Sequence, residues 1–142
     1  MKKIGRVVMV LCAVLLIVVM TAACSGSEET KELNVEGTWK LALNEDGLTA
    51  DQVTIYKNYL EGLEAQENTL VFGENGAVKI NAKVGGKEVS ENGSYTVADE
   101  IVTVTDPSGY ATGTMGTFKL VYQNNKLIMQ EQSMKYICFV KQ

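Results

Sequence analysis

The sequence of 142 residues contains no histidine. This absence excludes a Ser-His-Asp triad, a Cys-His pair and an HExxH zinc site, since each of them depends on imidazole. A calcium loop fails as well, because Ala42 and Val53 stand where an EF-hand loop around the acidic turn 44–47 needs its first and twelfth ligands. We therefore expect no metal, no cofactor and no enzymatic activity.

Basic residues are scarce. The chain has 13 lysines and arginines against 17 acidic residues, a formal net charge of −4. Three of the basic residues lie within the first six positions, so the rest of the chain is more acidic still. A nucleic-acid partner needs a basic surface that displaces counterions from phosphates. The composition excludes that class of partner, and it identifies no protein partner.

Only three cysteines occur, and they have separate surroundings. Cys12 lies in an apolar leader and Cys24 follows that leader, which leaves Cys138 alone in the rest of the chain. One thiol cannot form an internal disulfide. The alternation of Tyr136, Cys138 and Val140 predicts a strand that buries this thiol in an unreactive state.

The first 23 residues predict a secretory signal peptide. Three cations, Lys2, Lys3 and Arg6, precede an uninterrupted apolar run over residues 7–20, and small residues follow it up to Cys24. This ending resembles the lipobox of bacterial lipoproteins. The resemblance implies cleavage before Cys24 and a diacylglycerol on its thiol. The alternative is an uncleaved membrane helix, although residues 7–23 fall short of the ~20 that span a bilayer.

A lipid on Cys24 would hold the protein on the outer face of the cell membrane. Two or three acyl chains anchor a protein stably, whereas one chain does so only weakly. Residues 24–35 are mostly Ser, Gly, Glu, Lys and Thr, which predicts a flexible tether. The folded domain is then expected over residues 36–142.

Short apolar and polar alternations fill this domain. They predict strands over residues 36–43, 69–73, 77–84, 87–90, 93–98, 101–105, 115–122, 127–131 and 135–140. Turn residues separate them, among them Gly85 with Gly86, Asn92 with Gly93 as a type I′ turn or a bulge, and Asn124 with Asn125. Eight or nine short antiparallel strands predict an all-β fold, a closed or half-open barrel.

One helix is expected between the first two strands. Thr49 and Gln52 have the spacing of a capping box, in which each side chain bonds the other residue's amide. Apolar residues then recur at helical spacing to about residue 66. Near the C-terminus the strands are apolar on both faces and need cover on both. We expect the helix to close one end or one outer face of the barrel.

The Gly37-Thr38-Trp39-Lys40 opening, the 74–76 hairpin, the 93–97 strand and the final 139–141 segment together carry a family resemblance. From residue 36 to the end, the chain resembles the lipocalin-like domains of small lipoproteins from low-GC Gram-positive bacteria. The resemblance implies a β-barrel and no established activity.

A small barrel can hold one ligand in its mouth or fill itself with its own side chains. The first hypothesis is a binder of a small hydrophobic ligand, with the helix and loop 106–116 framing the entrance. The alternation predicts nine large side chains on the inside of the barrel, namely Trp39, Leu41, Phe72, Ile80, Tyr95, Val97, Phe118, Leu120 and Tyr122. The candidate ligand-binding residues are Trp39, Phe72, Tyr95, Tyr110, Phe118 and Tyr122. The second hypothesis is a solid barrel that acts as a protein-interaction or envelope-stabilising module. Exposed clustering of Tyr56, Tyr59 or Tyr110 would favour this second hypothesis.

Overall fold

The structure, a computed structural model, describes residues 32–113 and 115–142. Within them, Leu33–Gln142 form one compact unit that contains every strand and the whole core. This part therefore has what it needs to fold on its own. The predicted signal peptide, Cys24 and most of the predicted tether lie outside the described residues.

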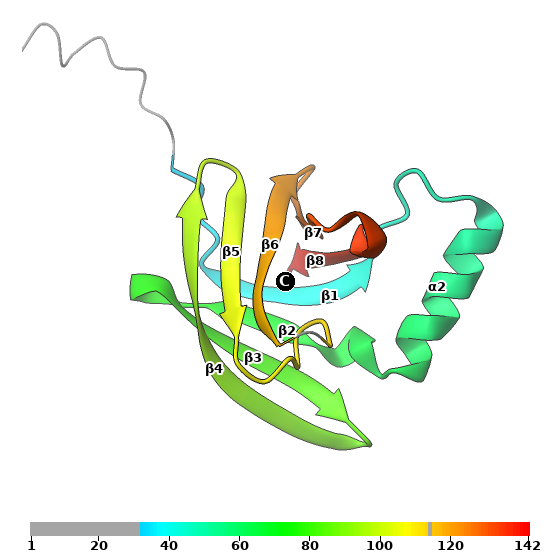
Figure 1. The fold of residues 1–142 in the computed structure, drawn as a ribbon, viewed down its shortest axis with the longest axis horizontal. Helices are drawn as coiled ribbons and strands as arrows, with labels where there is room; N and C mark the ends of the chain where they lie inside the picture. Colours follow the sequence, from blue (N-terminus) through cyan, green and yellow to red (C-terminus); the bar gives the residue numbers. More distant parts are fainter. Residues whose placement is uncertain (1–31, 114) are drawn as a thin grey trace, which may run out of the picture. The chain divides into compact units, whose positions relative to one another are not determined.

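Eight antiparallel strands close into a barrel in which each strand pairs with the next and β8 pairs back with β1 (Figure 1). Closure confirms the predicted all-β barrel and decides against the half-open alternative. The strands are β1 (Gly37–Leu43), β2 (Thr69–Phe72), β3 (Ala77–Val84), β4 (Lys87–Ala98), β5 (Ile101–Asp106), β6 (Gly116–Gln123), β7 (Lys126–Met129) and β8 (Ile137–Lys141).

The prediction of a break at Asn92 and Gly93 is wrong. β4 runs through both residues, which pair with Lys79 and Val78 of β3 in an unbroken register. Gly93 is needed for space and not for a turn, because a Cβ atom there would collide with the carbonyl oxygen of Thr105 in β5. The two predicted strands over residues 87–90 and 93–98 are therefore one, which reduces nine strands to eight.

The helix α2 (Ala50–Gly62) starts as predicted. The Thr49 side chain accepts a hydrogen bond from the Gln52 amide, and the Gln52 side chain accepts one from the Thr49 amide at 3.0 Å. Its predicted end near residue 66 is wrong, because Glu64 adopts a left-handed conformation with φ of 55°. The chain continues from there as a short 3₁₀ turn, Ala65–Glu67, which leads into β2.

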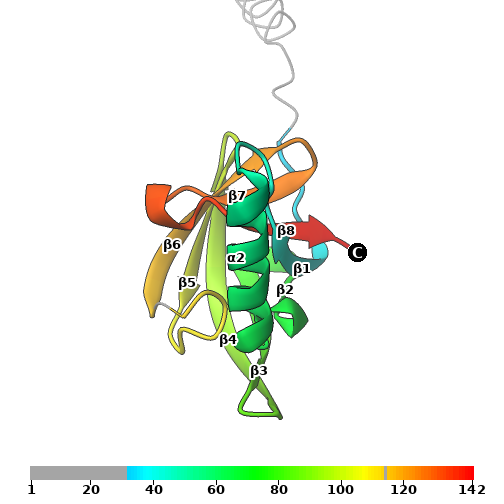
Figure 2. The same ribbon diagram turned by 90° about the vertical axis from the view of Figure 1, so that its right-hand side faces the viewer.

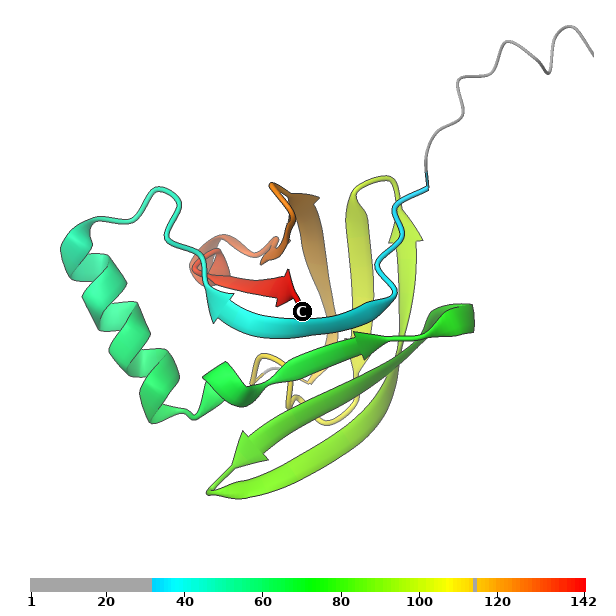
Figure 3. The same ribbon diagram turned by 180° about the vertical axis from the view of Figure 1, so that it is seen from behind.

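The helix lies across the end of the barrel where β1 stops and β2 starts, one of the two places predicted for it (Figure 2). In Figure 3, β1, β2 and β3 lie in front and α2 projects beyond their edge. Only Leu60 of the helix is buried. One further contact is a parallel stack of the Tyr56 and Tyr136 rings, whose centroids are 4.2 Å apart.

Large apolar side chains fill the barrel interior. Six of the nine side chains predicted to point inward are buried, namely Trp39, Leu41, Phe72, Ile80, Phe118 and Leu120, while Tyr95, Val97 and Tyr122 pack partly buried against them. The core also takes in Val35, whose carbonyl accepts a 2.7 Å hydrogen bond from the Trp39 indole. The packing of the barrel thus includes a residue from the stretch predicted as tether.

Candidate functional site

A half-open pocket of about 460 Å³ lies at the helix end of the barrel. Five parts of the chain contribute to its wall: Leu41 of β1; Tyr59, Leu60, Leu63, Ala65 and Asn68 from α2 and the segment after it; Ala82, Lys83 and Val84 of β3; the loop residues 109–113; and Met134, Tyr136 and Ile137 before and in β8. Most of these side chains are apolar or aromatic. A pocket of this size and lining is typical of small-molecule sites.

The helix supplies one wall of the pocket and part of its rim. Leu60 points inward and is 2% exposed, whereas Tyr59 and Leu63 are 54% and 55% exposed at the mouth. The two side chains are four residues apart, so they lie on the same side of the chain at the helix end. The helix therefore presents to solvent a face suited to an apolar ligand or partner.

The opposite wall is a loop that Asp106 holds in shape. The Asp106 side chain is fully buried, and one of its oxygens, Oδ1, accepts hydrogen bonds from the Ser108 amide, the Ser108 hydroxyl and the Gly109 amide at 2.7–3.0 Å. Its other oxygen, Oδ2, accepts one from the Ala111 amide at 2.8 Å. Charge-assisted bonds of this kind are stronger than neutral ones. One carboxylate thus fixes the backbone of the loop beside the pocket.

Asn68 ties this loop to the strand side of the pocket. Its side-chain nitrogen donates to the carbonyl oxygens of Tyr110 at 3.0 Å and Ala111 at 3.4 Å. Its backbone carbonyl accepts from the Leu41 amide at 2.9 Å. The side-chain oxygen of Asn68 and the hydroxyl of Thr112 are both buried and have no hydrogen-bond partner among the described residues.

Tyr136 in the pocket wall is half-buried. Burial raises the pKa of the Tyr136 hydroxyl above its ordinary value of 10.0, and the neighbouring Tyr59 and Tyr56 raise it further. Lys83 is the one charged residue in the described wall. Lys83 on β3 is the register partner of Glu88 on β4.

Of the six predicted ligand-binding residues, only Tyr110 lines the pocket. Trp39, Phe72 and Phe118 are buried in the core. Tyr95 and Tyr122 pack against this core, and their hydroxyls donate to the Gly73 carbonyl at 2.8 Å and to the Asn125 side chain at 2.9 Å. The structure does not bring these six side chains together around one site.

The polar residues of the pocket have no signature in the sequence. Asn68 and Thr112 are separate residues outside any strand or helix, and their meeting depends on how loop 107–113 folds back against the chain before β2. The one local signal was Asp106 followed by Ser108 and Gly109, since aspartate before such residues favours a side-chain-bonded turn. That pattern indicates a turn but not what the turn faces.

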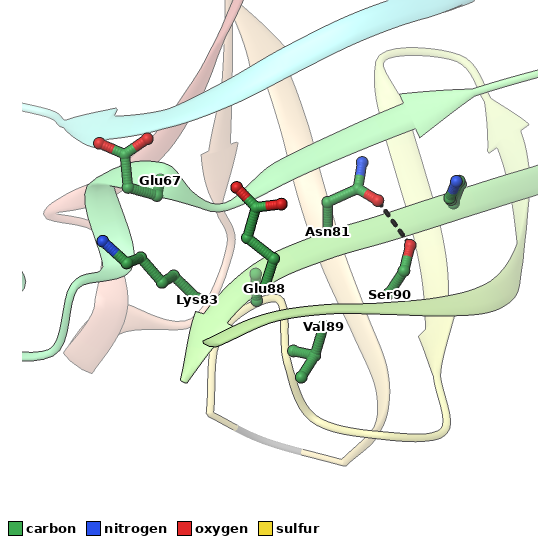
Figure 4. A pocket seen from close by; sticks show the side chains of 8 residues that line it. Glu67, Asn81, Lys83, Glu88, Val89 and Ser90 are labelled. Atoms are coloured by element: carbon green, nitrogen blue, oxygen red, sulfur yellow. Dashed lines mark hydrogen bonds between the residues drawn. The ribbon is translucent and has the colours of Figure 1, made fainter. Parts of the chain in front are cut away.

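A second hollow, of about 480 Å³, lies along the β3–β4 hairpin and is polar (Figure 4). Lys83, Glu67 and Glu88 carry opposite charges around it. Asn81 and Ser90 bond each other across the strands at 2.6 Å. The wall of this hollow is mostly polar and charged, so it is a weaker candidate for a hydrophobic ligand than the apolar pocket.

Cys138 is fully buried, which confirms the prediction of a buried thiol. Burial is the main cause that raises its pKa to about 11, and the Lys126 ammonium opposes this effect. A thiol with so high a pKa holds little of the reactive thiolate at neutral pH. Within residues 32–113 and 115–142, no three acidic or cysteine side chains gather in a way that could hold a metal ion.

The same described residues include no helix long and apolar enough to cross a membrane. No family model, curated protein or solved structure matches this chain.

Proposed function

We propose that the protein binds a small hydrophobic molecule in the pocket between α2 and loop 107–113. The single observation that carries this proposal is the pocket itself, about 460 Å³ with a mainly apolar wall at the mouth of a closed barrel. Cavities of roughly 300–1,000 Å³ with such walls are the usual sites of small ligands. The helix and the loop frame it, which fits the entrance expected from the sequence.

We also propose that Cys24 carries the lipid that tethers the domain to the outer face of the membrane. The cationic start, the apolar run and the small residues before Cys24 support this anchor. The barrel agrees with the fold implied by the likeness to lipocalin-like lipoproteins. Globomycin, which blocks the lipoprotein signal peptidase, should make the precursor accumulate in cells; an unchanged mature form would contradict the anchor.

The binding proposal can be tested with N-phenyl-1-naphthylamine, a dye whose fluorescence rises when it leaves water. The chain from Ser25 onward should bind it with saturation at one molecule per protein. The Leu63→Glu variant places a charge on the pocket wall and should weaken binding roughly tenfold, because a carboxylate resists burial beside an apolar ligand.

The matched control is Ile55→Glu, on the same helix. Ile55 is 62% exposed, as readily accessible as Leu63, but it does not line the pocket. Both variants should therefore keep the unfolding free energy of the parent within about 0.5 kcal/mol. Equal weakening by both variants, or no saturable binding by the parent, would contradict the proposal.

A second candidate function, docking of a protein partner, is favoured by one observation. Ile55 and Tyr59 of α2 and Leu63, which caps the end of the helix, are all more than half exposed, and Tyr56 and Tyr110 lie partly exposed. Tyrosines and apolar side chains of this kind are common at protein interfaces. The Ile55→Glu variant separates the two functions, because it should leave dye binding unchanged and should weaken the binding of a protein partner that covers the helix.

A further inference from the structure

Two residues of the pocket wall, Asn68 and Thr112, each carry a buried polar atom that is unpaired. These atoms are the side-chain oxygen Oδ1 of Asn68 and the hydroxyl oxygen Oγ1 of Thr112. Asn68 as a residue is 7% exposed, and neither atom has a hydrogen-bond partner among the described residues. Buried polar groups in proteins are nearly always paired, so two in one wall need a reason.

The orientation of the Asn68 side chain is fixed by its surroundings. Its nitrogen faces two backbone carbonyl oxygens, those of Tyr110 and Ala111, at 3.0 and 3.4 Å. The reverse orientation would place the amide oxygen against those carbonyls and lose both bonds. Oδ1 is therefore left as a free acceptor that can only take a hydrogen bond.

We infer that the ligand of this pocket carries a hydrogen-bond donor, a hydroxyl or an amide N–H, at one end of an apolar body. The donor bonds Oδ1 of Asn68, and the Thr112 hydroxyl supports the same polar group. The apolar body lies against Leu60, Leu63 and Ile137. This inference rests on the proposed function, since it names the chemical class of the molecule bound there.

The two unpaired atoms differ in what they can bond, and both are reached only by a movement of the wall. Asn68 Oδ1 accepts only, and the Thr112 hydroxyl can accept as well as donate. Both atoms are covered by neighbouring protein atoms, so the ligand must displace a wall side chain to reach them. The hydrogen bond it forms offsets a buried acceptor that is otherwise left without a partner.

The test compares two isomers, decan-1-ol and 1-methoxynonane, as competitors of N-phenyl-1-naphthylamine on the chain from Ser25 onward. The two have the same atoms and nearly the same shape, but only the alcohol has a donor. A hydroxyl costs more to take out of water than an ether, so an apolar pocket without a free acceptor favours the ether. We expect the alcohol to bind roughly fivefold more tightly.

Thr112→Val keeps the shape of the side chain and removes only an unpaired hydroxyl. This variant should preserve the fold and weaken the binding of the alcohol by about threefold. Asn68→Leu should abolish the preference for the alcohol altogether while the ether still binds. Should Asn68→Leu fail to fold, because it also loses the two bonds to the loop, the isomer comparison on the parent chain decides alone.

The outcomes separate this inference from the function on which it rests. If both isomers bind and the ether binds as tightly as the alcohol or more tightly, the inference of a donor on the ligand is wrong, while the proposed hydrophobic binding is still supported. Failure of the dye and both isomers to bind overturns the proposed function, and the inference with it. A preference for the alcohol in the parent chain, together with dye binding that Leu63→Glu weakens and Ile55→Glu leaves unchanged, supports both.

Discussion

At the scale of single residues, Cys138 shows how burial changes chemistry. Its side chain is fully buried in β8, and its sulfur donates to the Ala42 carbonyl at 3.6 Å. The ordinary pKa of 9.0 is raised to about 11, mainly because the charged thiolate would be cut off from water. The folded barrel thus keeps this proton over a range of pH in which the unfolded chain loses it.

This difference predicts a loss of stability in alkali. Below pH 9 the thiol is protonated in both states and contributes nothing to the pH dependence. Between pH 9 and 11 the unfolded chain binds fewer protons than the folded one, so the free energy of unfolding falls as the pH rises. The loss should reach about 2 kcal/mol near pH 10.5, measured by urea unfolding followed by circular dichroism.

Cys138→Ala isolates the contribution of the thiol. Burial also raises the pKa values of Tyr95 and Tyr136, and these groups keep a smaller alkaline loss in both proteins. The variant should therefore show a shallower decline between pH 9 and 11 than the parent. Identical slopes in the two proteins would contradict the role assigned to the thiol.

At the scale of elements, the loop after β5 depends on one carboxylate. Asp106 accepts four hydrogen bonds from the loop, three of them from backbone amides. Asp106→Asn exchanges one accepting oxygen for a donating NH₂ group that faces a donor. We expect a loss of about 2–3 kcal/mol of unfolding free energy, since the position is buried.

Ser108→Ala is the graded comparison for this loop. It removes the hydroxyl that donates to Asp106 at 2.7 Å and accepts from the Tyr110 amide at 3.2 Å. The backbone bonds to Asp106 remain, so the loss should be about 1 kcal/mol. Urea unfolding of both variants checks the order, and a smaller loss for Asp106→Asn than for Ser108→Ala would refute it.

Elements with local signals were predictable from the sequence. The capping box at Thr49 and Gln52 places the helix start correctly, because both bonds lie within four residues. The end of the helix could not be predicted in this way, because Glu64 adopts its left-handed conformation in a segment that also packs against β1. The Asn92-Gly93 pair gave a wrong prediction for a related reason. An Asn-Gly pair is typical of a turn, but glycine is also found in a strand where a neighbouring backbone comes too close for a side chain.

At the scale of the whole molecule, Gly93 lets the barrel close. β4 pairs with β3 along its first part and with β5 along its second, and Gly93 lies near the change. Gly93→Ala should cost about 3 kcal/mol, because its Cβ would meet the Thr105 carbonyl and press on Val78 and Ile80.

Gly62→Ala is the matched control, because Gly62 ends α2 with no atom near its missing side chain. It should be neutral or slightly stabilising, since alanine favours helix more than glycine does. Thermal unfolding followed by circular dichroism compares the two. Equal midpoints for Gly93→Ala and the parent would show that the contact with Thr105 is not limiting.

The barrel could be predicted from alternation alone, whereas the pocket could not. Alternation marks which residues face inward, and six of the nine so marked are buried. The candidate ligand-binding residues were chosen as large aromatics, and large aromatics fill a small barrel. The pocket instead needs smaller side chains such as Ala65, Asn68 and Ala111, whose positions depend on segments far apart in the sequence.

Trp39, the only tryptophan in the sequence, is buried in the barrel core and does not line the pocket, and its ring lies edge-on to Tyr122 with the centroids 6.4 Å apart. Three of the six tyrosines, Tyr59, Tyr110 and Tyr136, surround the pocket. Tryptophan emission therefore reports the integrity of the barrel core without an attached label. A dye bound in the pocket reports binding, so unfolding and ligand binding can be followed by two different signals.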